Sequence, residues 1–165
     1  MSVLTAEEEA AGRHPGARRP ERTRFVSSYG LRLAVYEWGE AEAPPILLSH
    51  GGFDFAGTFD VFAPLLAAAG YRVVAWDQRG HGDSDHAELY CWDADVRDML
   101  AVLDSIGPEP LILIGHSKGG AISTHLIQAA PDRVRAFVNL DGIPSHKPPP
   151  DAADHERTRL LAKEP

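Results

Sequence analysis

The chain has 165 residues, which is enough for one domain with a sizeable buried core. Its net charge of −8 at pH 7 and its lack of a basic stripe argue against nucleic-acid binding, and its single cysteine, Cys91, excludes an internal disulfide. No stretch reaches the roughly 20 apolar residues of a membrane span, and residues 1–22 lack the apolar core of a signal peptide. We therefore expect a cytoplasmic protein with no membrane partner and with a flexible tail over 1–22.

Strand and helix patterns alternate along the rest of the chain. Six strands are predicted, at 24–28, 31–38, 45–50, 72–77, 110–116 and 134–141. The first two form an antiparallel hairpin, and the last four alternate with helical segments at 58–69, 92–106 and 121–130, which predicts parallel strands. In the first helical segment Phe62, Leu65, Leu66 and Ala69 share an apolar face. The fold class is α/β, with a mostly parallel central sheet, helices on both faces and an N-terminal antiparallel hairpin.

The sequence GHSKGG at 115–120 directly follows an apolar strand pattern and precedes a helical one. This is the context in which a G-x-S-x-G turn presents a serine nucleophile. Gly115 and Gly119 fit the turn because side chains there would obstruct the close backbone contacts of a sharp strand-to-helix connection. Ser117, at the tip of the turn, is the predicted nucleophile.

A serine attacks an acyl carbon only if a base takes its proton and hydrogen-bond donors stabilise the oxyanion that forms. The backbone N–H of Lys118, directly after the nucleophile, is the first predicted donor. The second is expected from the glycine turn HGGF at 50–53, where Gly52 is our choice and Phe53 the alternative. We interpret the ammonium group of Lys118 as a solvated charge beside the turn, with contact to a substrate carboxylate as the alternative.

Three further polar residues lie near these turns in the sequence. His116 adjoins Ser117, but neighbours on a strand point to opposite faces, so its ring is not expected to reach the hydroxyl. His50 is expected to hydrogen-bond nearby backbone and shape the glycine turn. Asp77 ends the fourth strand and is interpreted as forming an ion pair within the turn that contains Arg79.

The glycine turn at 50–53, the DQRGHGDS turn at 77–84 and the GHSKGG turn resemble, in order and spacing, the α/β-hydrolase superfamily. The resemblance covers about residues 24–143. It implies a serine hydrolase that acts on a small-molecule ester or related acyl substrate through an acyl-enzyme on Ser117, with a lactonase, an amidase, a carbon–carbon bond hydrolase and a cofactor-free peroxidase left open. The chain contains no complete dinucleotide, P-loop or zinc motif, so we expect no cofactor and no metal. A serine at the elbow disfavours the dehalogenase and epoxide-hydrolase branches, which use a carboxylate nucleophile.

In this superfamily an acid and then a histidine follow the serine in the chain. Asp141, at the end of the sixth strand, lies where some members place the acid, and the alternative is that it caps the turn at 141–144. The histidine is expected further along a longer chain. We therefore interpret 23–144 as an incomplete hydrolase core and 145–165 as a linker and the start of a cap or lid helix.

The pattern of the sixth strand is apolar and β-branched, as in the interior of a sheet. We expect a partner chain or a missing C-terminal part to cover its edge, because an exposed edge of this kind promotes aggregation. The alternative function is a non-catalytic fragment or ligand-binding module of the same fold that lacks the catalytic histidine.

Overall fold

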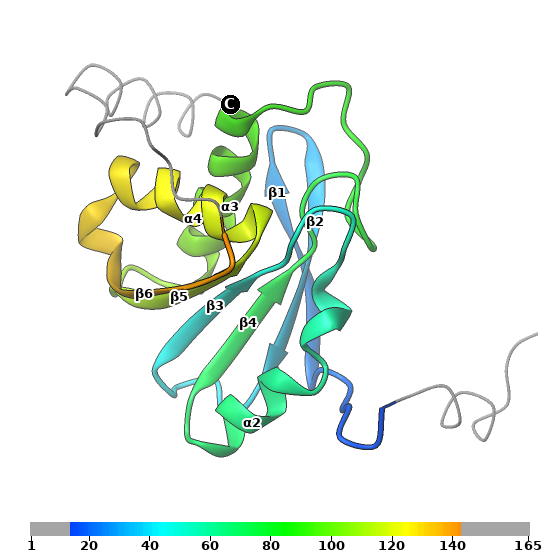
Figure 1. The fold of residues 1–165 in the computed structure, drawn as a ribbon, viewed down its shortest axis with the longest axis vertical. Coiled ribbons are helices and arrows are strands. Elements are labelled where there is room, and N and C mark those ends of the chain that lie inside the picture. The colour runs from blue at the N-terminus through cyan, green and yellow to red at the C-terminus, as the bar shows by residue number, and fades with distance from the viewer. Residues whose placement is uncertain (1–13, 143–165) are drawn as a thin grey trace, which may run out of the picture.

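The computed structural model describes residues 14–142 as a six-stranded sheet flanked by helices (Figure 1). The strands are β1 (Arg22–Ser28), β2 (Leu31–Trp38), β3 (Pro45–Ser49), β4 (Arg72–Trp76), β5 (Leu111–His116) and β6 (Val134–Leu140). The helices are α2 (Phe62–Ala68), α3 (Trp92–Ile106) and α4 (Lys118–Ala129), with short 3-10 turns η1 (Ala56–Phe59) and η2 (Pro131–Arg133). The linker and the start of a cap or lid helix predicted over 145–165 lie outside the described residues.

The strand order is β1-β2-β4-β3-β5-β6. β1 pairs antiparallel with β2, and β2 pairs antiparallel with β4, whereas β4, β3, β5 and β6 are mutually parallel. The predicted α/β class, the N-terminal hairpin and the four parallel strands are confirmed.

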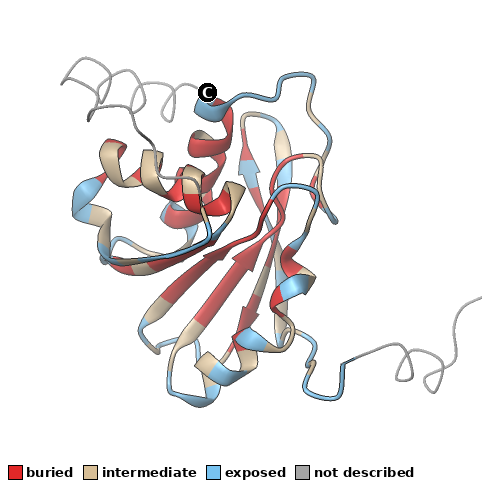
Figure 2. Cartoon of the chain, in the orientation of Figure 1, coloured by how far each residue is buried: buried red, intermediate tan, exposed pale blue. Residues whose placement is uncertain are grey.

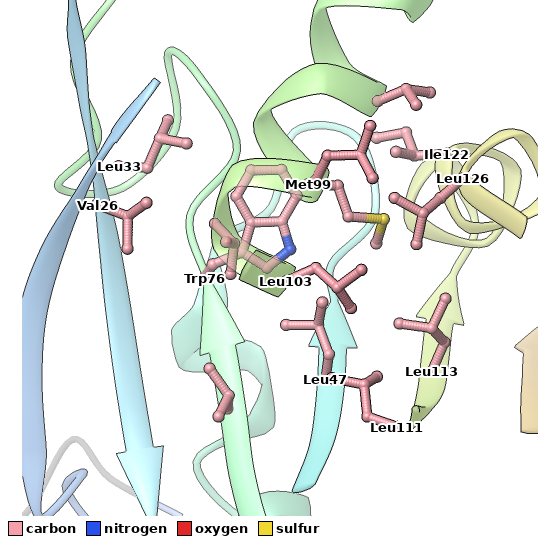
Figure 3. Packing of buried hydrophobic residues seen from close by; sticks show 14 of the residues in the cluster. Val26, Leu33, Leu47, Trp76, Met99, Leu103, Leu111, Leu113, Ile122 and Leu126 are labelled. Carbon is pink, nitrogen blue, oxygen red and sulfur yellow. The ribbon is translucent and has the colours of Figure 1, made fainter. Parts of the chain in front are cut away.

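Side chains alternate between two hydrophobic cores on opposite faces of the sheet, as the two-residue period of a strand requires. Leu47 of β3 enters the core under α3 and α4, whereas its neighbours Ile46 and Leu48 pack beneath η1 and α2. In the first core Trp76 lies close to Met99 of α3 (Figure 3). Helices therefore cover both faces of the sheet, as predicted.

The segment predicted as one helix over 58–69 forms two elements, η1 and α2. The predicted apolar face is wrong in part: Phe62 is 37% exposed and Leu65 is 64% exposed, whereas Leu66 packs against the core. Ala63, outside the predicted face, is fully buried. Because the helical period restarts at Phe62 after η1, a different face of α2 meets the sheet. The small side chain of Ala63 packs against the sheet on this face.

The described structure begins before the predicted boundary at residue 23. The backbone N–H of Arg18 donates to Asp60 O at 2.9 Å, and the indole N–H of Trp38 donates to Arg18 O at 3.1 Å. Residues 14–21 therefore lie against the domain rather than in the predicted tail. Among residues 14–142, no helix is long and apolar enough to cross a membrane.

The central parallel strands and the edge strand β6 differ in burial (Figure 2). The strands β3 and β4 are almost wholly buried, whereas β6 is exposed along most of its length, with Val138 44% and Leu140 39% exposed. No described strand pairs with the outer edge of β6.

The carboxyl ends of β3 and β5 are neighbours at the centre of the sheet. The chain after β3 leads to η1 and α2 on one face, and the chain after β5 leads to α4 on the other. In open α/β sheets such a reversal leaves a crevice at the carboxyl ends of the strands, where ligands bind. The glycine turn and the GHSKGG turn both lie here.

Candidate active site

Ser117 connects β5 to α4 in a strained backbone conformation, with φ 48° and ψ −113°. A positive φ is uncommon for a residue with a side chain, and such strain persists only where the surroundings fix it. Here the Ser117 N–H donates to Leu140 O at 3.0 Å, and Ser117 O accepts from Ala121 N–H at 3.2 Å. The predicted strand-turn-helix context of Ser117 is confirmed.

The two elbow glycines stand where backbone segments touch. A Cβ on Gly115 would lie 2.6 Å from Gly119 O. A Cβ on Gly119 would lie 2.6 Å from His50 O and would also collide with Ser49 O. Only glycine lets the start of α4 pack this closely against the end of β3, and this contact brings the elbow and the glycine turn together.

The glycine turn at 50–53 lies directly beside the elbow. A Cβ on Gly51 would lie 2.9 Å from His116 Nδ1 and 3.4 Å from Ser117 Cβ, and one on Gly52 would lie 3.9 Å from Lys118 Cβ. Phe53 has φ 60° and a fully exposed side chain. The turn and the residues around the nucleophile thus lie side by side.

Three backbone N–H groups near the nucleophile have no hydrogen-bond acceptor among the described residues. No residue between 14 and 142 accepts a hydrogen bond from the backbone N–H of Gly52, Phe53 or Lys118. Free N–H groups from a glycine turn and from a helix N-terminus are the donors that an oxyanion requires. Which of Gly52 and Phe53 supplies the second donor stays a prediction, as does the role of Lys118.

His50 holds the glycine turn in place, as predicted. Its Nε2 accepts from Gln78 N–H at 3.0 Å, so the proton of the neutral ring lies on Nδ1, which donates to Gly51 O at 2.7 Å. The side-chain amide of Gln78 donates to His50 O at 2.6 Å. Burial lowers the pKa of His50, which keeps the ring neutral and structural.

The ion pair expected for Asp77 within its own turn is absent from the described region. Asp77 accepts from Ala56 N–H at 2.7 Å, from Asp83 N–H at 2.8 Å and from the hydroxyl of Tyr36 at 2.8 Å. Arg79 extends to α3 instead. The expectation was wrong because donors from three segments of the chain converge on the Asp77 carboxylate. These hydrogen bonds stabilise the carboxylate without a cation.

Arg79 is buried and holds α3 against the sheet. Its Nε donates to Asp98 Oδ2 at 2.7 Å and its Nη2 to Asp98 Oδ1 at 2.8 Å. The hydroxyl of Ser28 on β1 donates to the same carboxylate at 2.6 Å. Two parallel charge-assisted hydrogen bonds compensate a buried carboxylate well, so this pair fixes the start of α3 beside the site.

The ammonium group of Lys118 is paired rather than solvated. Its Nζ lies 3.1 Å from Asp95 Oδ2 on α3, and the side chains of Lys118 and Asp95 are 25% and 6% exposed. The interpretation as a solvated charge was wrong, because α3 places a carboxylate beside the elbow, and contact with a substrate carboxylate stays a prediction. Burial raises the pKa of Asp95, and Lys118 opposes that rise.

His116 is exposed, and its ring lies against Gly51 on the side where Ser117 Cβ also lies. The structure gives it no hydrogen bond to Ser117. Among residues 14–142, no histidine or carboxylate is hydrogen-bonded to the Ser117 hydroxyl.

Asp141 follows β6 with φ 56° and an exposed side chain. The turn after β6 is fixed by Asn139, whose Oδ1 accepts from Gly142 N–H at 2.8 Å and whose Nδ2 donates to Gly142 O at 3.2 Å. The turn predicted over 141–144 lies partly outside the described residues, so whether Asp141 caps it stays a prediction. Asp141 lies between Leu140, which binds the Ser117 N–H, and Gly142, so it shares the carboxyl edge with Ser117. Its role as the acid stays a prediction.

The chain belongs to the α/β hydrolase fold family, whose profile matches residues 44–162. The fold, the strained serine after β5 and the adjoining glycine turn agree with this assignment.

Similar proteins include an epoxide hydrolase and a lipase. The chain is 35% identical over 139 residues to epoxide hydrolase A of Mycobacterium tuberculosis, covering 81% of this chain and 43% of that protein. It is 41% identical over 111 residues to lipase LipV of the same organism, covering 67% of this chain and 42% of that protein.

Among solved structures, the thioesterase domain from the curacin biosynthetic pathway is similar, with a TM-score of 0.71 and 29% identity. The match covers 84% of this chain and 52% of that one. The chain thus spans about half the length of these relatives or less.

Proposed function

We propose that this chain carries the nucleophile and the oxyanion hole of a serine hydrolase that acts on an ester or related acyl substrate. The observation that carries the proposal is the strained Ser117 beside three backbone N–H groups that have no hydrogen-bond acceptor between residues 14 and 142. Two of the similar proteins are named a lipase and a thioesterase, and both names describe acyl chemistry.

In the proposed reaction Ser117 Oγ attacks the acyl carbon while its proton passes to a general base. The new oxyanion accepts hydrogen bonds from the Lys118 N–H and from Gly52 or Phe53. Collapse of this intermediate expels the alcohol, which takes the proton from the base, and leaves an acyl group on Ser117. Water then attacks the acyl group in the same way and releases the acid.

The base in this proposal is a histidine oriented by an acid, for which Asp141 is our candidate. In the family the histidine follows the acid in the chain, so we assign it to no residue between 14 and 142. The reaction needs no cofactor and no metal.

We also propose that further polypeptide pairs with the exposed edge of β6. Val138 and Leu140 are exposed there and the backbone has no described partner on that side. A strand added to this edge would bury both side chains and satisfy the free backbone groups.

The competing function is a ligand-binding module that keeps the crevice and has no turnover. Hydrolysis of p-nitrophenyl esters of graded acyl length distinguishes the hydrolase from the binding module. The assay compares Ser117→Ala with a matched control, Ser27→Ala, on the exposed face of β1. We expect Ser117→Ala to lower kcat by a factor on the order of 10⁴–10⁶ and Ser27→Ala to leave it unchanged. A folded protein that binds the ester and releases no product supports the binding module.

A further inference from the structure

The side chain of Lys118 extends from the elbow past the glycine turn to α3. Its backbone follows the nucleophile, and its stem lies near Gly52, where an added methyl group would lie 3.9 Å from Cβ and 4.0 Å from Cδ of Lys118. Its Nζ lies 3.1 Å from Asp95 Oδ2. Lys118 therefore extends from the elbow, past the second half of the oxyanion hole, to α3.

Asp95 is the buried end of this connection. Its Oδ1 has no hydrogen-bond partner among the described residues, and Arg79 Nε lies 4.0 Å away. Arg79 cannot serve both carboxylates well, because its Nε and Nη2 are engaged with Asp98. Lys118 is therefore the main partner of Asp95, and a buried carboxylate strongly favours keeping such a partner in place.

Asp95 itself is held firmly. It lies in the first turn of α3, its N–H donates to Cys91 O at 3.0 Å, and the neighbouring Asp98 fastens α3 to Arg79. Since α3 is fixed, the position of the Lys118 ammonium group is fixed as well. The stem of Lys118, which leaves room for about one methyl group beside Gly52, then limits how far the glycine turn can move toward it.

We propose that Asp95 is a positioning residue for the oxyanion hole, which acts by holding Lys118 beside Gly52 and so limits how closely the two halves of the hole approach each other. Asp95 touches no reacting atom in this scheme. The inference rests on the proposed function, because the separation of these N–H groups affects a rate only if an acyl substrate reacts at Ser117.

Ester hydrolysis by Asp95→Asn, Lys118→Met and the double variant tests the inference. Each single variant removes the charge attraction and nearly keeps the shape of the side chain. We expect kcat to fall about tenfold or more while KM stays within about twofold, because donors that act in the transition state lower kcat and kcat/KM together. The double variant should be no slower than the slower single variant, since both changes remove one interaction.

Two variants serve as controls. Lys118→Arg retains the positive charge and should keep most of the kcat that Lys118→Met loses. Asp93→Asn removes a carboxylate from the same turn of α3, where Asp93 is exposed, and should leave kcat unchanged.

A second measurement needs no turnover and separates this inference from the proposed function. We expect the ¹⁵N order parameters of the Gly52 and Phe53 amides to fall in Asp95→Asn and Lys118→Met, from about 0.85 toward about 0.6, and to stay unchanged in Asp93→Asn. If the unsubstituted protein hydrolyses no ester and the order parameters still fall, the proposed function fails and the positioning role stands.

The inference is wrong if the order parameters of the glycine turn are the same in all variants. It is also wrong if an active enzyme keeps its kcat in both single variants, or if their effects add in the double variant. Should Asp95→Asn fail to fold, Lys118→Met decides the question alone, because Lys118 is the more exposed partner.

Discussion

Glu37 gives the sharpest quantitative prediction about stability. This carboxylate lies on β2 with a side chain that is 3% exposed, and it accepts from Arg24 at 2.8 Å and from Arg72 at 2.9 Å. Burial alone would raise its pKa, but the hydrogen bonds from Arg72 and Arg24 outweigh burial and lower the pKa from its usual 4.5 to about 2. A fall of this size corresponds to about 3 kcal/mol of folding stability at neutral pH.

The direction of the shift in the Glu37 pKa determines how the folding stability depends on pH. Because the folded-state pKa lies below the unfolded one, the stabilisation is fully present above pH 4.5 and is lost as the pH falls toward 2. Glu37→Gln should therefore unfold about 3 kcal/mol more easily than the unsubstituted protein at pH 7, and the difference should shrink steadily as the solution is acidified.

Urea denaturation at a series of pH values between 7 and 2.5 measures this difference. Asp85→Asn is the control, because its ion pair with Arg32 is exposed and solvent screens it. A difference between Glu37→Gln and the unsubstituted protein that is the same at every pH would refute the reasoning, since packing rather than charge would then explain it.

Three further predictions concern packing around the site and the sheet edge. Gly119→Ala should lower the unfolding free energy by about 1–3 kcal/mol, because its Cβ meets the backbone of β3, whereas Gly52→Ala, with only ordinary contacts, should change it little in the same denaturation assay. Arg79→Met should cost about 3–5 kcal/mol by leaving a buried carboxylate without its partner, and Arg32→Met, at an exposed pair, should leave the unfolding midpoint unchanged. Val138→Lys on the open edge should reduce concentration-dependent self-association in sedimentation velocity, and equal association of both proteins would contradict an open edge at β6.

The strands and most of the helices could be predicted from local patterns. α3 spans the predicted residues, Trp92–Ile106, because its apolar stripe recurs with the helical period. The helix over 58–69 could not be predicted correctly, since the 3-10 turn before Phe62 depends on contacts with the sheet and with Asp77. Cys91 lies at the N-cap of α3, outside the packed face, and is exposed.

The nucleophile turn could be predicted because its glycines and its place between a strand and a helix are local features. The partners of the turn could not, since they come from distant segments. Asp95 is the clearest case: it lies 23 positions before Lys118, and only the packing of α3 against α4 brings the two together. A signal was present, because Asp95 and Asp98 share the buried face of α3 with apolar residues, and charges on such a face require partners.

The central claim is that Ser117 is a nucleophile poised beside an oxyanion hole. Labelling of the purified protein with a fluorophosphonate, followed by intact and peptide mass spectrometry, tests this most directly. Fluorophosphonate reacts with a serine only where a base takes its proton, so an adduct also shows that such a base acts on Ser117. The account predicts a single adduct on Ser117 that is absent from Ser117→Ala; a folded protein with no adduct, or with its adduct on another residue, would contradict it.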